Sequence, residues 1–206
     1  MNNYLIDGAM YPSLKAYFDT MPQGILTHPS AQTRAFYSIE LRKRLGTKLA
    51  ESKLPFTLKQ ALLASWKPDD WIPATTYAAL SCICADTLWR TQQEFHAGMY
   101  ETASVMYASM LFRAVMFIMS PSLMMMGAAS RWNGFHKGTS LRAEAATKTS
   151  GRFILGYPSK LFAEPCLRSL GATFDCAISG AGAKNFTYKM TDVSDSNAVY
   201  QMTWSV

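Results

Sequence analysis

At 206 residues the chain can form one generous domain or two very small ones, and a hydrophobic share of 49 % supports a sizeable buried core. The formal net charge of +6 is moderate, and the basic residues come without a zinc finger, a basic-zipper pattern or a Gly-rich RNA-binding motif. Nucleic acid is therefore not an expected partner. The N-terminus lacks the charged and apolar regions of a signal peptide, which predicts a cytoplasmic protein with four reduced cysteines.

The first half of the chain has the 3.6-residue apolar period of amphipathic helices. The period predicts one helix that opens the chain and ends at Pro22. A longer second helix is expected after Ser30, with an apolar stripe that continues to Leu49. Thr57 and Gln60 have the spacing of a capping box and predict the start of a further helix.

Three more helices are expected in the middle of the chain. A linker rich in proline and aspartate precedes a helix over 75–93, and Gly98 separates that helix from the next one, over 99–119. Ser120 and Pro121 then have the types expected of the N-cap and the first residue of a short helix.

The apolar stretch from Ala103 to Met119 imitates a membrane span. A transmembrane helix needs about twenty apolar residues and is destabilised by a central arginine. Arg113 lies in the middle of this stretch, and Ser120 and Pro121 end it. The sequence therefore predicts a buried core helix here.

After Gly138 the apolar period changes to two, as in half-buried strands. Two strands are expected over 141–146 and 152–157, followed by a short helix between Ser159 and Leu170. Three further strands are expected at 174–178, 186–190 and 200–204.

The predicted fold class is α+β, with a helical N-terminal part, 1–137, packed on a C-terminal antiparallel sheet, 138–206, in the order ββαβββ. A small sheet is marginally stable until helices cover its apolar face. We therefore expect residues 1–206 to form one domain.

Short motifs in the C-terminal part carry a family resemblance. Residues 141–144 and 151–155 form the strand pair, and Tyr157-Pro158-Ser159 follows in the place of a Tyr-x-Ser-x-Arg motif. Over 75–206 the chain resembles the haem-nitric-oxide/oxygen-binding domains and, in the same superfold, the 4-vinyl-reductase-type and Golgi-transport ligand-binding domains. It is also similar to an uncharacterised group of delta-proteobacterial domains. The resemblance implies the shell of a ligand-binding domain.

Two positions depart from the haem-binding pattern of the resembled family. The motif arginine, which holds the haem propionates there, falls on Leu161, with Lys160 as the nearest cation. The family's proximal histidine has no counterpart on the helix over 120–132, and His136 comes after it. The sequence therefore predicts no bound cofactor and no metal site. His96 is the one candidate haem ligand, and its alternative is a histidine hydrogen-bonded at a helix end.

Arg113 and the methionines near it form the candidate ligand site. An arginine among apolar residues must reach the surface, pair with an internal acid, or bind a carboxylate or phosphate of a ligand. Thirteen methionines suit either a loosely specified core or an adaptable pocket. The residues expected to bind a ligand with Arg113 are Met106, Met110, Met116 and Phe117, to which the resemblance adds Tyr157 and Ser159.

The remaining patterns decide between classes of function. No nucleophile elbow and no Cys–His spacing is present, so an enzyme is the least supported class. A basic stretch on the second helix, Arg42, Lys43, Arg44 and Lys48, is the candidate partner-binding face and has a weaker attraction for an anionic membrane surface. The sequence favours a non-enzymatic sensory or regulatory domain that binds a small apolar or amphiphilic ligand and a protein partner. The alternatives are a ligand-free interaction module of the same fold and a haem-based gas sensor.

Overall fold

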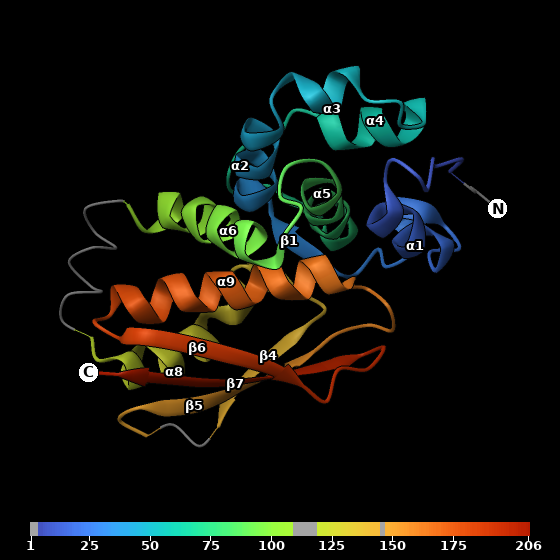
Figure 1. Ribbon diagram of the computed structural model, residues 1–206. Helices are drawn as coiled ribbons and strands as arrows, with labels where there is room; N and C mark the ends of the chain where they lie inside the picture. The colour runs from blue at the N-terminus through green and yellow to red at the C-terminus, as the bar shows by residue number, and fades with distance from the viewer. Residues whose placement is uncertain (1–3, 109–118, 145–146) are drawn as a thin grey trace.

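The computed structural model of the protein describes residues 4–108, 119–144 and 147–206. Helices make up its N-terminal part, and a four-stranded antiparallel sheet lies in its C-terminal part, which confirms the predicted α+β class (Figure 1). The helices of the N-terminal part are α1 (Pro12–Asp19), η1 (Gly24–Leu26), α2 (Ala35–Leu45), α3 (Thr47–Glu51), α4 (Phe56–Leu63), α5 (Ala74–Thr87) and α6 (Gln92–Tyr107). The later elements are α8 (Pro121–Arg131), η2 (Trp132–Gly134), β4 (Ser140–Glu144), β5 (Ser150–Gly156), α9 (Glu164–Gly180), β6 (Lys184–Thr191) and β7 (Asn197–Ser205).

The molecule is layered, and helix α9 lies in its middle (Figure 1). The sheet has the strand order β4-β5-β7-β6 with every neighbouring pair antiparallel. Helices α8 and α9 pack against the sheet, α5 and α6 pack on α9 from the other side, and α1 packs on α5. The short helices α3 and α4 lie farthest from the sheet.

The sheet buries one face and exposes the other, as the alternating sequence predicts. In β5 the side chains of Phe153 and Leu155 are buried, whereas the neighbouring Arg152 and Ile154 are half-buried. Strand β7 continues the buried face with Tyr200 and the apolar residues that follow it at every second position.

Helix α9 extends through the segment that the sequence predicts as a strand. Phe174, Cys176 and Ile178 alternate in the sequence, but all three are helical and buried. The expected order ββαβββ is wrong at this point, and the described order after residue 138 is ββαββ. A helix covered on two sides buries more than one stripe, so residues two apart can both be apolar without forming a strand.

The boundaries of the N-terminal helices also differ from the prediction. The expected long second helix is interrupted at Gly46, whose φ of 55° lies in the left-handed region that glycine adopts readily. The predicted capping box at Thr57 is absent, because α4 begins after Pro55. The box forms instead between Thr91 and Glu94 at the start of α6.

Two further boundaries decide how the middle of the chain is arranged. Gly98 does not separate two helices but lies inside α6, where the indole of Trp89 occupies the place of a side chain. The N-cap at Ser120 is confirmed, since its hydroxyl accepts a hydrogen bond from the Leu123 backbone N–H.

A second, three-stranded sheet was not predicted. Its strands β1 (Gln32–Arg34), β2 (Trp71–Pro73) and β3 (His136–Lys137) are antiparallel in the order β2-β1-β3. The sheet joins three distant parts of the chain. Its pairing of His136 with Thr33 brings β3 next to the start of α2. Among the described residues, no helix is long and apolar enough to cross a membrane.

Candidate functional site

A cavity of about 100 Å³ lies between the helical layer and the α8–α9 layer. Helices α2 and α6 contribute to one side of its wall, and α8, η2, β4 and α9 contribute to the other. Most of its wall is apolar or aromatic, with Met106, Met124, Trp132, Leu141, Leu170 and Phe174 among the lining residues. Apolar walls with a few polar groups are typical of small-molecule sites.

His136 is the polar residue of the wall with the most unusual surroundings. It is 5 % exposed, and its ring stacks on Trp132 with centroids 3.9 Å apart and an angle of 15°. The Trp132 ring is itself held by a 2.9 Å hydrogen bond from its Nε1 to Thr139 Oγ1. Among the described residues, the buried Nδ1 of His136 has no hydrogen-bond partner. Burial lowers the pKa of His136 to about 3, so the imidazole is neutral near pH 7.

The position of His136 depends on the small sheet. Its backbone pairs with Thr33 of β1, and the Phe135 carbonyl accepts a 3.0 Å hydrogen bond from the Arg34 backbone N–H. His136 lies between Gly134 and Gly138, and this composition is typical of a polar turn. Pairing with β1 and stacking on Trp132 nevertheless bury the side chain.

Hydroxyl groups complete the polar part of the wall. Tyr37, Tyr107 and Thr173 also line the cavity. Burial raises the pKa of the Tyr37 and Tyr107 hydroxyls, so both remain protonated and neutral. Arg131, an exposed residue in the last turn of α8, is the one charged residue among the described lining residues.

The structure does not bring the predicted ligand-binding residues that it describes together at one site. Met106 lines the cavity as a half-buried residue of α6. Tyr157 is buried elsewhere, where its hydroxyl donates to the Ser194 and Asn197 carbonyls at 3.0 and 3.2 Å, and Ser159 is exposed. The other predicted ligand residues lie outside the described part of the chain: Met110, Arg113, Met116 and Phe117.

The predicted partner-binding residues have contacts within the protein. Arg42 donates to the Ala64 carbonyl at 2.6 Å and stacks over Trp66. Lys43 pairs with Glu40 at 2.6 Å, and Arg44 pairs with Glu101 at 3.0 Å. Lys48 is exposed.

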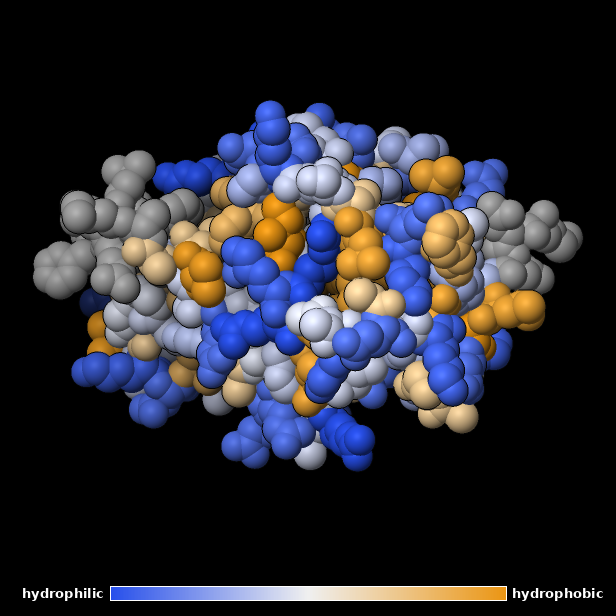
Figure 2. All heavy atoms as spheres, turned by 90° about the horizontal axis from the view of Figure 1, so that it is seen from above, coloured by the Kyte–Doolittle hydropathy of each residue, from blue (hydrophilic) through white to orange (hydrophobic). Residues whose placement is uncertain are grey.

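The face that carries α3 and α4 has no single chemical character. Hydrophilic and hydrophobic side chains alternate over it, and a hollow lies near its centre (Figure 2). Three of the four predicted partner-binding residues have polar contacts within the protein, and Lys43, Arg44 and Lys48 are exposed. The basic stretch therefore stays a predicted partner-binding face.

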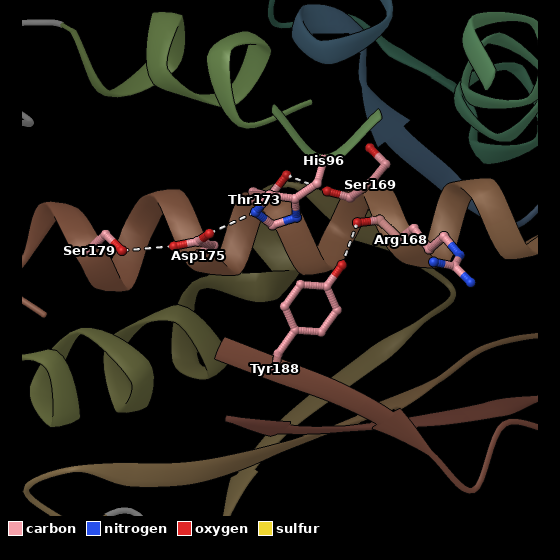
Figure 3. Close-up of polar contacts among 7 residues, drawn as sticks. All are labelled: His96, Arg168, Ser169, Thr173, Asp175, Ser179 and Tyr188. Atoms are coloured by element: carbon pink, nitrogen blue, oxygen red, sulfur yellow. Dashed lines mark hydrogen bonds and ion pairs between the residues drawn. The ribbon is translucent and has the colours of Figure 1, made fainter. Parts of the chain in front are cut away.

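His96 joins α6 to α9 through Asp175 (Figure 3). Its Nε2 lies 2.8 Å from Asp175 Oδ2, and the other carboxylate oxygen accepts a 2.7 Å hydrogen bond from the Ser179 hydroxyl. Tyr188 lies beside the imidazole with ring centroids 5.8 Å apart. His96 is not among the residues that line the cavity. Its contacts match the alternative of a hydrogen-bonded structural histidine.

The described residues do not fit a haem. Leu161, at the position of the propionate-binding arginine, is fully buried, and its carbonyl accepts a 2.8 Å hydrogen bond from the Tyr17 hydroxyl. The neighbouring Lys160 is exposed with its Nζ 3.9 Å from Asp195. A porphyrin is several times larger than benzene, which fills a cavity of about 150 Å³. The cavity of about 100 Å³ beside His136 is therefore much smaller than a porphyrin.

Comparison with known proteins identifies the fold. No family model and no curated protein matches the chain, but solved structures of H-NOX domains do. An unliganded Fe(II) H-NOX variant from K. algicida has 9 % identity and a TM-score of 0.56, covering 84 % of this chain and 97 % of its own. A Cs H-NOX variant carrying 4-cyano-L-phenylalanine has 10 % identity and a TM-score of 0.54, covering 84 % and 94 %.

A third H-NOX structure gives the same result. An oxygen-binding H-NOX domain related to soluble guanylate cyclases, in its oxygen complex, has 8 % identity and a TM-score of 0.54, covering 84 % of this chain and 93 % of its own. The chain therefore has the H-NOX fold, and the resemblance indicated by the C-terminal motifs is confirmed at the level of the fold.

Proposed function

We propose that this protein is a non-enzymatic sensory or regulatory domain that binds a small molecule in the cavity beside His136 and transmits its occupancy to a protein partner. The observation that carries the proposal is the position of the cavity. It lies where the helical layer meets the layer that covers the sheet, so both layers contribute to its wall. A ligand at such a junction can favour one relative position of the two layers over another.

The chemistry of the wall supports binding rather than catalysis. Its polar groups other than the exposed Arg131 are neutral, and neither a carboxylate nor a thiol is present among the described lining residues. The four cysteines are buried and unpaired, and burial raises the pKa of each thiol, so none is an activated nucleophile. The H-NOX fold is consistent with a ligand-binding domain.

The proposal is tested by filling the cavity. Ala128 lines it from α8, so Ala128→Leu places three additional carbon atoms there. We expect native mass spectrometry of freshly purified wild-type protein to show a bound small molecule, and the Ala128→Leu protein to lack it. Ser130→Leu is the matched control, because Ser130 is an exposed residue of the same helix outside the cavity wall.

Folding of the variants is checked separately by circular dichroism and thermal unfolding. If Ala128→Leu does not fold, Ala177→Val fills the cavity from α9 instead. A wild-type mass equal to that of the polypeptide, together with no thermal shift by any benzene-sized compound, would contradict the proposal.

A further inference from the structure

We infer that the cavity takes a neutral, ring-sized molecule with one hydroxyl or N–H group, and that the imidazole of His136 binds this group. The inference rests on the proposed function and specifies the ligand of the same site. It follows from the volume of the cavity, the charge of its wall and the hydrogen bonding of His136.

The volume limits the size of the ligand. A cavity of about 150 Å³ lined by aliphatic and aromatic side chains accepts benzene. At about 100 Å³ the cavity beside His136 has the size of a single five- or six-membered ring once its side chains adjust.

The charge of the wall limits the ligand to a neutral molecule. No aspartate or glutamate is among the described lining residues, so a buried cation has no counter-ion. An anion meets only Arg131, which is exposed to solvent. Transfer of an unpaired charge from water into an apolar cavity is strongly unfavourable.

The geometry of His136 determines what the ligand must carry. Stacking on Trp132 fixes the plane of the imidazole and therefore the direction of its ring nitrogens. A buried polar atom without a partner costs about 1–3 kcal/mol, which a ligand that supplies the missing hydrogen bond recovers. A hydroxyl can donate or accept, so it pairs with a ring nitrogen of His136 in either neutral tautomer. A ring without a polar group cannot form this hydrogen bond.

Phenol and toluene test the inference, because they have almost the same shape and differ in the hydroxyl group. Their affinities are measured by isothermal titration calorimetry on the wild-type protein and on His136→Phe, which keeps a ring for stacking on Trp132. We expect the wild type to bind phenol about tenfold more tightly than toluene, as one recovered hydrogen bond implies. His136→Phe is expected to lose this preference, and benzoate is expected not to bind either protein.

One variant serves as a control and another as a replacement for His136→Phe. His28→Phe changes a histidine outside the cavity wall and should keep the preference for phenol. If His136→Phe does not fold, His136→Met provides an apolar side chain without a ring and should likewise lose the preference.

The outcomes separate this inference from the proposed function. Equal binding of phenol and toluene by the wild type, or a preference that persists in His136→Phe, overturns the role of His136 while the cavity remains a binding site. Absence of binding by all three probes, with Ala128→Leu indistinguishable from wild type, overturns both and leaves a cavity that holds only water.

Discussion

The neutral state of His136 makes the stability of the protein depend on pH. Its pKa is about 3 in the folded protein and 6.5 in an unfolded chain. Below pH 6.5 the unfolded chain gains a proton that the folded protein does not accept until about pH 3, so stability falls as the pH falls through this range. From pH 7 to pH 5 we expect a loss of about 2 kcal/mol from this group, measured by urea unfolding.

His136→Phe isolates this contribution, because it removes the titrating ring and leaves every carboxylate in place. Burial raises the pKa of Tyr37 and Tyr107 in the same cavity wall, so both hydroxyls stay neutral between pH 3 and pH 7. The variant should lose about 2 kcal/mol less than the wild type between pH 7 and pH 5. Equal losses in both proteins would show that His136 does not stay neutral in the fold.

Asp175 is the second residue whose contacts lead to a prediction. Its carboxylate is 14 % exposed and has contacts with both His96 of α6 and Ser179 of its own helix. Asp175→Ala should reduce the free energy of unfolding by about 1–3 kcal/mol, because it leaves two partly buried groups without partners. Asp19→Ala is the control, since Asp19 pairs with Lys15 where both side chains are exposed, and it should change stability by less than about 0.5 kcal/mol. Similar losses from both substitutions would contradict this assignment.

At the level of elements, helix α9 shows where sequence patterns fail. Strand β5 alternates between buried and half-buried residues along its whole length, and β7 alternates between buried and exposed residues from Tyr200 to Trp204. Helix α9 is covered by α5 and α6 on one side and by the sheet on the other. Its apolar residues therefore surround most of the helix, and a local window cannot distinguish this arrangement from a buried strand.

The candidate site was predictable only in part, for a related reason. Met106 was expected from the apolar stretch that begins at Ala103, and it lines the cavity. His136 was missed because its burial depends on pairing with β1, about a hundred residues earlier in the chain. No local pattern reports such a pairing. The Thr91–Glu94 capping box has a local spacing but was also missed, because the preceding helix was predicted to continue to residue 93.

Close packing of α9 on β6 gives a prediction at the same scale. A Cβ on Gly171 would lie 2.4 Å from the Tyr188 ring, whose hydroxyl donates to the Arg168 carbonyl (Figure 3). Alanine favours a helix by up to about 1 kcal/mol over glycine. Gly171→Ala should nevertheless destabilise the protein by about 1–3 kcal/mol, because the ring must move away from the helix. Chemical unfolding measures this change.

A double-mutant cycle provides the control for Gly171. In a Tyr188→Ala background the added methyl group meets no ring, so Gly171→Ala should become neutral or stabilising. Gly134→Ala, where a Cβ would meet nothing within 4 Å, should have little effect in either background. An unchanged cost of Gly171→Ala in the Tyr188→Ala protein would show that the contact with Tyr188 is not its cause.

At the level of the whole molecule, one hydrophobic core spans the boundary between the helical part and the sheet. The main core cluster contains Leu14 and Tyr77 of the helical part together with Phe153, Leu170 and Tyr200 of the C-terminal part. Buried hydrogen bonds cross the same boundary. The Tyr17 hydroxyl donates to the Leu161 carbonyl at 2.8 Å, and the hydroxyls of Tyr77 and Ser169 lie 2.5 Å apart.

Because the core is shared, neither part should fold alone. A fragment of residues 1–137 would expose the surfaces of α5 and α6 that pack on α9, and a fragment of residues 138–206 would lose the helical layer that covers α9. Unfolding of the intact chain should then be one cooperative transition. Circular dichroism follows the helices, and the five tryptophans report on both parts, since they extend from Trp66 to Trp204.

We expect the two signals to give the same midpoint in urea, and each separate fragment to lack a sigmoidal transition. Mixing the fragments should restore part of the helical signal, because the core forms only when both are present. The cavity makes this result relevant to function, since its wall has residues from both fragments and should be complete only in their complex. Two separated midpoints, or a 1–137 fragment with a sigmoidal transition of its own, would instead divide the chain into two folding units.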